Sequence, residues 1–519
     1  MSNLYNKLVS MKKLVLTATF IVCGVCMAAA QLLTVTPSFP RDTTSISIIT
    51  DCTKGNQGLL NYADVNDVYV HVGVITNLST SPTDWKYVKF TNFNAPNPAA
   101  KAENISANKY RYIITRIRDF FGVPAGETIK KVTFLLRNGA GTVVQRNIDG
   151  SDMYIDVYDP ALVNTKFVEP FMQPRYVPTP EPITKSVGDN INIFYLSSQT
   201  GDLRIYFNGT AVAFAPASNS INIAPLITAS GNQQIVGEAV VGATTKRDTI
   251  SFYVAPPTNI FPLPAGVRDG INYESGDTSA ILVLRAPSKS RVNVLGDFNN
   301  LTEQASYQMN KTPDGKFFWL RLTGLTPGTE YGYQYLVDGT IKIGDPYTQK
   351  VLDPNNDGFI SSATYPGLKP YPTGKTSGIV SVLQTNEPGY SWQVNNFTRP
   401  DKRSIVMYEL LVRDFVEAHD WKTLKDTLSY LKTLGINAIH VMPFNEFEGN
   451  LSWGYNPNYY FAPDKYYGPK NTLKAFIDEC HKNGIAVIMD MVLNHSFGTS
   501  PMVQLYFDGG LNRPASNNP

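Results

Sequence analysis

Cysteine is scarce in this sequence: four among 519 residues are too few for a scaffold held together by disulfides. No charge of one sign prevails, because 45 basic and 43 acidic side chains nearly cancel. This balance argues against a nucleic-acid partner and against a membrane surface held by charge. Charged residues make up only 17% of the chain, whereas 43% are hydrophobic and 12% are aromatic. A chain of this length and composition accommodates roughly three to five packed domains of about 100–200 residues each.

Long apolar runs are also rare, and the most prominent one extends from Leu14 to Met27. Two lysines precede it and three alanines follow it, which is the pattern of a cleaved export signal. Its fourteen residues are too few to cross a bilayer as a helix. We therefore predict that residues 1–30 are a signal peptide and that the mature protein is periplasmic, cell-surface or extracellular, with no membrane span. Cys52 and Cys480 then remain, and we expect both thiols to be free and buried.

From the end of this signal to about residue 375, short β-strand patterns dominate. Valines alternate with other residues from Val68 to Val74, which is typical of a half-buried strand. Residues 203–207 form another strand pattern that ends in Asn208-Gly209, a hairpin signal. Turn dipeptides such as Asp338-Gly339 separate further strands at the spacing of a β-sandwich. The predicted β modules span residues 31–165, 166–257 and 258–375.

Prolines and polar residues mark the predicted connections. Five prolines between Pro170 and Pro182 fix their φ angles and predict a stiff, extended spacer. Residues 376–403 are predicted to be a linker. The segment Asp353-Pro-Asn-Asn-Asp-Gly358 is similar to the opening of an EF-hand loop, but position twelve would be Thr364 rather than a bidentate Glu. We therefore predict a simple turn there.

The pattern changes at about residue 404. Apolar strands are predicted over residues 405–411, 436–441 and 485–489, with an amphipathic helix between each pair. Asp420 is placed to cap the first helix, and glycines close both helices. Continuous apolar strands that alternate with helices predict parallel pairing. The sequence stops at Pro519 after three such strands, so we expect residues 404–519 to form an incomplete α/β domain.

Polar clusters follow the end of each of these strands. They are Arg413-Asp414, Asn445-Glu446 with the segment Trp453-Gly-Tyr-Asn-Pro457, and Asp490-Met-Val-Leu-Asn-His495. Ligands bind beyond the carboxyl ends of parallel strands, so the three clusters are expected to share one face. A carboxylate at the end of a buried strand is costly unless it is paired or used. Together the clusters predict a functional site on this face.

These motifs carry a resemblance to a known family. The segment from Asp490 to His495 resembles the first signature region of the α-amylase family of glycoside hydrolases. The segment from Trp453 to Pro463 resembles the loop after the second barrel strand in pullulanase- and isoamylase-like members, and Met407 to Phe415 resembles the first strand. Residues 280–358, with Val294-Leu-Gly-Asp-Phe-Asn299, are similar to the early-set β-sandwich of branching and debranching enzymes. The implied fold is tandem β-sandwich modules followed by an incomplete (β/α)₈ barrel.

The resemblance implies roles for individual residues. Tyr455 would stack on the sugar at the cleavage subsite, and Trp453 of the same loop would also bind the substrate. His495 would hydrogen-bond a hydroxyl of that sugar, whereas Asp490 would orient a partner rather than attack. Asn494 matches a position that ligates calcium in many members, so calcium is the one cofactor to consider. His440, on the second strand, is expected to serve plain packing.

The implied activity is retaining hydrolysis of α-glucans such as starch, glycogen, pullulan or maltooligosaccharides. That reaction needs two carboxyl groups about 5–5.5 Å apart, which in this family come from strands four and five. The sequence ends before strand four, so no catalytic residue is assigned and residues 1–519 alone are expected to be inactive on starch. The alternative is a non-catalytic secreted glycan-binding protein, because the upstream modules resemble starch-binding regions. Its stacking platforms would be drawn from Trp85, Trp319, Trp392 and the row Tyr331, Tyr333 and Tyr335, although tyrosines inside strands more often belong to the core.

Overall fold

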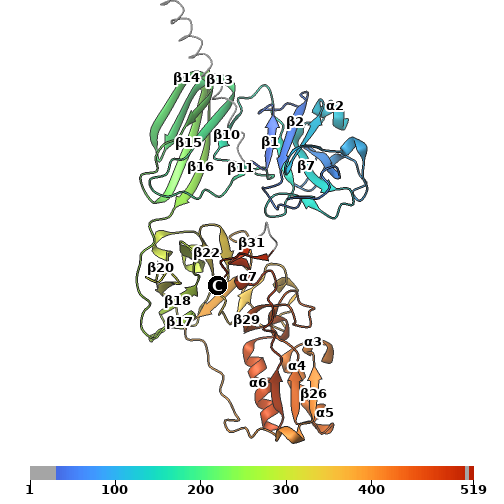
Figure 1. Ribbon diagram of the computed structural model, residues 1–519, viewed down its shortest axis with the longest axis vertical. Helices are drawn as coiled ribbons and strands as arrows, with labels where there is room; N and C mark the ends of the chain where they lie inside the picture. The colour runs from blue at the N-terminus through green and yellow to red at the C-terminus, as the bar shows by residue number, and fades with distance from the viewer. Residues whose placement is uncertain (1–30, 509–512, 519) are drawn as a thin grey trace, which may run out of the picture. The chain divides into compact units, whose positions relative to one another are not determined.

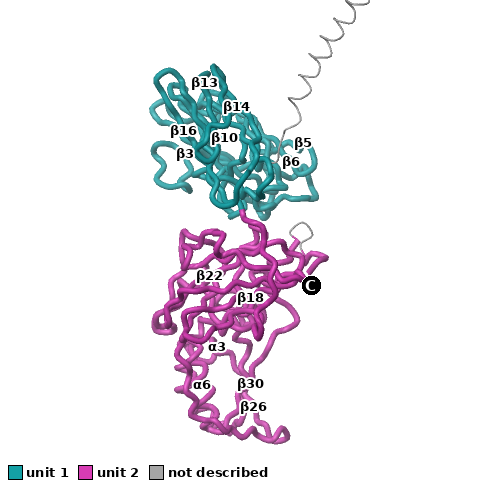
Figure 2. The backbone as a smooth tube through the Cα atoms, turned by 90° about the vertical axis from the view of Figure 1, so that its left-hand side faces the viewer, with its two compact units in different colours: residues 1–254 teal, residues 255–519 magenta. Residues whose placement is uncertain are grey.

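The computed structural model describes residues 31–508 and 513–518. The predicted export signal, residues 1–30, lies outside the described residues. The chain divides into two compact units, residues 1–254 and residues 255–519 (Figure 2). No helix in the described part of the chain is both long enough and apolar enough to cross a membrane.

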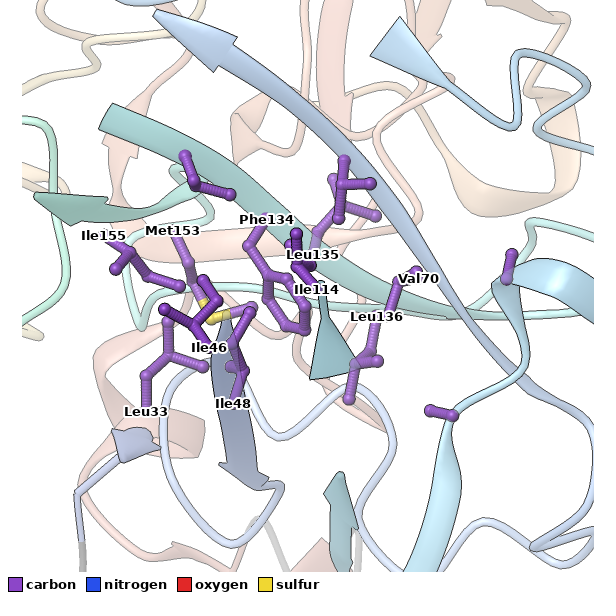
Figure 3. Packing of buried hydrophobic residues seen from close by; sticks show 14 of the residues in the cluster. Leu33, Ile46, Ile48, Val70, Ile114, Phe134, Leu135, Leu136, Met153 and Ile155 are labelled. Carbon is purple, nitrogen blue, oxygen red and sulfur yellow. The ribbon is translucent and has the colours of Figure 1, made fainter. Parts of the chain in front are cut away.

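The first unit begins with two antiparallel sheets that share one core. One sheet has the strand order β1 (Leu33–Thr36), β2 (Ile46–Asp51), β6 (Lys109–Ile114) and β5 (Glu103–Ser106). The other has the order β4 (Lys86–Lys89), β3 (Val68–Thr76), β7 (Ile129–Asn138) and β8 (Val144–Gln145), and β9 (Met153–Asp156) also pairs with β7. The short helix α2 (Ile117–Phe121) follows β6. Ile46 and Ile48 lie close to Phe134 and Met153 in the core between the sheets (Figure 3).

Strand β3 differs from its prediction, because it is buried along almost its whole length rather than on one face. The ring of His71 stacks on Trp85 at 5.6 Å between centroids and meets the edge of Phe93 at 5.1 Å. Trp85 and Phe93 come from the segment that follows the strand, and their rings cover the face that was expected to contact solvent. The expectation of a half-buried strand is therefore wrong.

A five-stranded sheet of long strands completes the first unit (Figure 1). Its order is β10 (Thr165–Glu169), β13 (Ile193–Phe207), β15 (Gly231–Val241) and β16 (Thr244–Val254), with β14 (Thr210–Ile223) also paired to β13. The hairpin predicted at Asn208-Gly209 is confirmed: it joins β13 to β14, and both residues have positive φ angles, 51° and 79°.

The Pro-rich segment is not the extended spacer predicted from its prolines. Strands β11 (Met172–Gln173) and β12 (Thr179–Pro180) pair antiparallel, so the segment folds back on itself. A proline is compatible with such an edge pairing because its missing N–H is not needed on the outer side. The fixed φ angles restrict the backbone of the prolines only. The turn between β11 and β12 sets the direction of the chain.

The second unit opens with another pair of antiparallel sheets. One has the order β17 (Gly270–Tyr273), β18 (Ser279–Arg285), β21 (Phe317–Thr323) and β20 (Asn310–Lys311). The other has the order β19 (Val292–Gly296), β22 (Glu330–Val337), β25 (Val380–Gln384) and β24 (Val351–Leu352), and β23 (Ile341–Ile343) pairs with β22. Tyr333 and Tyr335 are fully buried and donate hydrogen bonds of 2.8 and 2.9 Å to Asp345, so they belong to the core and are not stacking platforms.

Strand β25 lies inside the range 376–403, which was predicted to be a linker. It pairs with β22 from Glu330↔Gln384 to Tyr333↔Ser381, in the interior of the sheet. Its residues Val380 and Leu383 are buried at 0% exposure. The linker prediction is therefore wrong for this segment, because a strand of only five residues gives a weak pattern and its partners lie far away in the sequence.

Three parallel strands form the last part of the chain, as predicted. They have the order β26 (Met407–Leu410), β27 (Ala438–Val441) and β30 (Ala486–Met489). The helices are α3 (Val412–Phe415), α4 (Trp421–Asp426), α5 (Leu428–Thr433), α6 (Lys470–Lys482) and α7 (Pro501–Gln504), and β31 (Phe507–Asp508) pairs with β32 (Arg513–Pro514). Asp420 caps α4 by accepting a 2.7 Å hydrogen bond from the amide of Thr423. Cys52 and Cys480 are free and buried, which confirms that prediction.

The hairpin of β28 (Asn445–Phe447) and β29 (Pro457–Pro463) connects this α/β region to the sandwich. Just after it, the Lys465 ammonium is buried and contacts Glu446, and it lies 3.2 Å from Asp357 of the sandwich. Asp464 is a third buried carboxylate beside it. Burial raises the pKa values of Glu446 and Asp464, against the lowering effect of the Lys465 charge. We call these four residues the Lys465 cluster.

We predict that Lys465→Met destabilises the second unit by about 3–5 kcal/mol, because it leaves the buried carboxylates without their cation. The deficit in the free energy of unfolding should shrink as the pH is lowered, since protonation removes the uncompensated negative charge. Urea denaturation at a series of pH values measures both effects. Lys470→Met is the matched control: its ion pair with Glu387 is partly exposed, so the loss should be about 1 kcal/mol or less. Equal losses for the two variants would contradict the prediction.

Candidate functional site

The structure brings two of the predicted polar clusters together beyond the ends of the parallel strands. Asp490 follows β30 directly, and its amide donates a 3.0 Å hydrogen bond to the carbonyl of Val441 at the end of β27. The hydroxyl of Tyr455 donates a 2.8 Å hydrogen bond to Asp490 Oδ2. The loop before β29 and the loop after β30 are thus held against each other, as the sequence predicted. We call the group Tyr455, Asp490 and His495 the rim.

His495 contacts the same loop through its backbone. Its Nε2 lies 2.6 Å from the carbonyl oxygen of Tyr455, and a carbonyl can only accept, so Nε2 carries the proton. The backbone of His495 accepts a 2.7 Å hydrogen bond from the hydroxyl of Tyr460, on β29. Nδ1 of this exposed ring has no hydrogen-bond partner among the described residues, and in this tautomer it is an acceptor. Only Nδ1 is therefore left to contact a ligand hydroxyl.

Tyr455 combines a fixed hydroxyl with an accessible ring. The hydrogen bond to Asp490 raises the pKa of Tyr455 to about 12, so the phenol stays protonated and keeps donating in neutral solution. The residue is nevertheless 40% exposed, and Trp453 in the same loop is 60% exposed. The arrangement presents aromatic surface next to a carboxylate, which suits a ligand with one apolar face and several hydroxyl groups.

His440 has a more prominent place than the packing role that its sequence position suggested. It lies on β27, between β26 and β30, with Nδ1 at 3.3 Å from Glu409 and Nε2 at 3.9 Å from Asp490. Glu409 stands opposite His440 in the parallel register. Sequence reasoning did not single out Glu409. The signal available was a carboxylate inside an otherwise apolar strand, one residue before its end.

The remaining residues of the predicted clusters lie in two different places. Arg413 binds the carboxylate of Asp414 through Nε at 2.7 Å and Nη2 at 3.2 Å, and it also donates to the carbonyl of Leu451. This pair therefore supports the loop that carries Trp453 and Tyr455. Asn445 and Glu446 do not share the face. They are buried, because β28 turns back to pair with β29, and Glu446 points to Lys465 instead.

Metal binding gains no support from the described residues. Asn494 is exposed, and the described part of the chain has no group of three or more His, Cys, Asp or Glu side chains that could hold a metal ion. Calcium also binds amide and backbone carbonyl oxygens, so the calcium role expected of Asn494 stays a prediction. The turn predicted at residues 353–358 is confirmed, since Asp353 accepts a 2.8 Å bond from the amide of Asn355 and donates its own amide to Asp357.

We predict an energetic coupling between the two side chains that join the rim loops. In a double-mutant cycle, Tyr455→Phe and Asp490→Ala should show a coupling of about 0.5–1.5 kcal/mol in the free energy of unfolding, the range of a partly exposed hydrogen bond. Urea denaturation of both single variants and the double variant measures it. Tyr455→Phe combined with Asp414→Ala is the control, and these two changes should be additive. A coupling of zero in the first cycle would mean that the hydrogen bond does not hold the loops together.

Known proteins resemble parts of this chain. Residues 384–508 match the family model described as the catalytic domain of alpha amylase. The 1,4-alpha-glucan branching enzyme of Cupriavidus pinatubonensis is 30% identical over 238 residues, which cover 43% of this chain and 30% of that enzyme. The malto-oligosyltrehalose trehalohydrolase of Saccharolobus solfataricus is 29% identical over 164 residues, covering 32% of this chain and 28% of that enzyme. The chain thus spans less than a third of the length of either curated relative.

Two solved structures are similar as well. A putative alpha amylase from Salmonella typhimurium is 26% identical, with a TM-score of 0.36, and the alignment covers 46% of this chain and 36% of that one. The pullulanase SAP of group B Streptococcus, solved with maltotetraose, is 17% identical, with a TM-score of 0.36 and coverage of 61% and 46%. The family match begins within β25 and extends over the rim, the parallel strands and their helices. Residues 384–508 therefore match part of the catalytic domain of the alpha-amylase family.

Proposed function

We propose that the rim binds a glucose unit of an α-glucan beside the bond to be cleaved, in an exported glycoside hydrolase that uses retaining hydrolysis. The observation that carries this proposal is the 2.8 Å hydrogen bond from Tyr455 to Asp490, which fixes the ring while its face stays accessible. The relatives support the substrate class, since their names refer to 1,4-alpha-glucan and to malto-oligosyltrehalose. Export is inferred from the sequence pattern of residues 1–30 alone.

A pyranose ring has an apolar face and a rim of hydroxyl groups, and the two sides of the site match these features. The exposed ring of Tyr455 takes the apolar face, and Trp453 adds aromatic surface on the same loop. His495 accepts a hydrogen bond from a sugar hydroxyl at Nδ1, because its Nε2 is engaged by the Tyr455 carbonyl. The free oxygen of Asp490 accepts another. Starch, glycogen, pullulan and maltooligosaccharides all offer such a unit.

The carboxylates of this region position groups rather than attack the sugar. Asp490 Oδ2 already accepts the proton of Tyr455, and Asp414 is held in a two-point pair with Arg413. Retaining hydrolysis needs a free nucleophilic carboxylate and a carboxylic acid on either side of the bond. We therefore assign neither role to residues 1–519.

We predict that Tyr455→Ala weakens the binding of maltotriose about tenfold, which corresponds to about 1.4 kcal/mol of lost stacking. Tyr455→Phe keeps the ring and should bind within about threefold of the parent protein. Isothermal titration calorimetry on folded protein measures both. Tyr430→Ala is the control, since Tyr430 is another accessible tyrosine, 55% exposed, on α5 outside the rim. Unchanged affinity in Tyr455→Ala would remove the sugar platform from the proposal.

We also predict that purified residues 1–519 release no reducing ends from soluble starch above the level of a buffer blank. The physical reason is that no unengaged pair of carboxylates is assigned to flank the scissile bond. A colorimetric reducing-end assay over a long incubation measures the activity. The same preparation must bind maltotriose, so that inactivity is not caused by unfolding. Measurable hydrolysis would overturn the assignment of a purely positioning role to these carboxylates.

A further inference from the structure

A large groove in the second unit lies outside the rim. Its volume is about 1270 Å³, which exceeds the ~300–1,000 Å³ typical of small-molecule pockets and suits an extended ligand. Strands β17, β18 and β25 of the sandwich line one side, and β29 with the start of α6 lines the other. None of Tyr455, Asp490 and His495 contributes to its walls.

Aromatic surface stands in the middle of this groove. Tyr347 of the sandwich and Phe461 of β29 stack at 5.2 Å between ring centroids, with 28° between their planes. Both remain accessible, at 39% and 57% exposure, and Tyr273 is 49% exposed in the same groove. The position of Tyr347 depends on Gly270, whose φ is +83° and where an added Cβ would lie 2.4 Å from Tyr347 Cβ. The rings therefore form a platform that the backbone holds in place.

Most charges in the groove walls are paired, while Arg268 and Asp269 also line the groove and Asp269 accepts a 3.1 Å hydrogen bond from the Tyr347 hydroxyl. Arg321 lies 3.0 Å from Glu274, Lys350 lies 2.7 Å from Glu330, and Lys470 contacts Glu387. Each of these cations has its carboxylate partner in the same groove. Lys465 also lines it, but the Lys465 cluster compensates its charge. A strongly anionic or cationic ligand would have to break such pairs, whereas a neutral ligand can hydrogen-bond their outer edges.

The groove also offers uncharged polar groups beside the rings. Gln349, Gln384 and Asn471 line it with amide side chains, which both donate and accept hydrogen bonds. Accessible aromatic faces, amides and paired charges are the complement of a chain of neutral sugars, which alternates apolar ring faces with hydroxyl groups. We infer that this groove is a second carbohydrate site, which binds a neutral oligosaccharide of several units, separate from the rim.

The test titrates the full chain with maltohexaose and, in parallel, with cellohexaose, and it maps protection by hydrogen–deuterium exchange. At least one of these neutral hexasaccharides should protect residues 268–273 and 461–471 from exchange. Phe461→Ala should weaken that binding about tenfold, because half of the stacked platform is removed. Phe461→Trp restores a flat ring and should stay within about threefold. Phe359→Ala is the control, since Phe359 is 79% exposed and outside the groove.

The outcomes separate this inference from the proposed function. Binding that Phe461→Ala weakens and Tyr455→Ala leaves intact supports the groove, whatever happens at the rim. Binding that only Tyr455→Ala weakens overturns the groove and leaves the rim proposal standing. If neither hexasaccharide binds the folded protein at millimolar concentration, both fail. Circular dichroism and unchanged urea midpoints for the two Phe461 variants exclude misfolding as the cause of any loss.

Discussion

The buried ammonium of Lys465 is the interaction on which the arrangement of the second unit depends. A cation removed from water is stable only when carboxylates and hydrogen bonds replace its hydration. Here Glu446 comes from the α/β region and Asp357 from the sandwich, so the cation can be satisfied only when both regions are in contact. Hydrophobic contacts tolerate sliding, whereas a buried ion cluster fixes one arrangement. The hairpin of β28 and β29 is therefore held in one position between the sandwich and the α/β region.

This anchoring explains how the sandwich contributes to the rim. Tyr459 of β29 is buried and packs with Val351, and its hydroxyl comes so close to Gly344 that an added Cβ there would lie 2.5 Å away. The chain leaves this fixed strand in one direction into the loop of Tyr455. Tyr460, on the same strand, reaches the loop after β30 and holds the backbone of His495. The rim thus takes its geometry from the sandwich as much as from the parallel strands that carry Asp490.

The local sequence pattern predicted those features that neighbouring residues determine. Continuous apolar runs, the Asp420 cap and the Asn208-Gly209 turn each depend on a few adjacent residues, and the structure has all three. That the loops of Tyr455 and Asp490 lie on one face followed from the rule that parallel strands end on one side, but the hydrogen bond between the two side chains did not. By contrast, β25 and the inward direction of Glu446 depend on partners from distant parts of the chain. No local pattern encodes such partners. The contacts of His440 with Glu409 and Asp490 could not be predicted for the same reason.

The rim and the groove differ in charge in a way that follows from their proposed roles. At the rim, Glu409 and Asp490 stand on either side of His440, so carboxylates gather where a glycosidic bond would be broken. There the carboxylates orient neighbouring groups, since Asp490 accepts the proton of Tyr455 and Glu409 faces the ring of His440. In the groove, by contrast, most cations and carboxylates form ion pairs around a platform of rings. Such a surface does not stabilise a change in the charge of the ligand. This suits a site that binds a sugar chain without reacting with it.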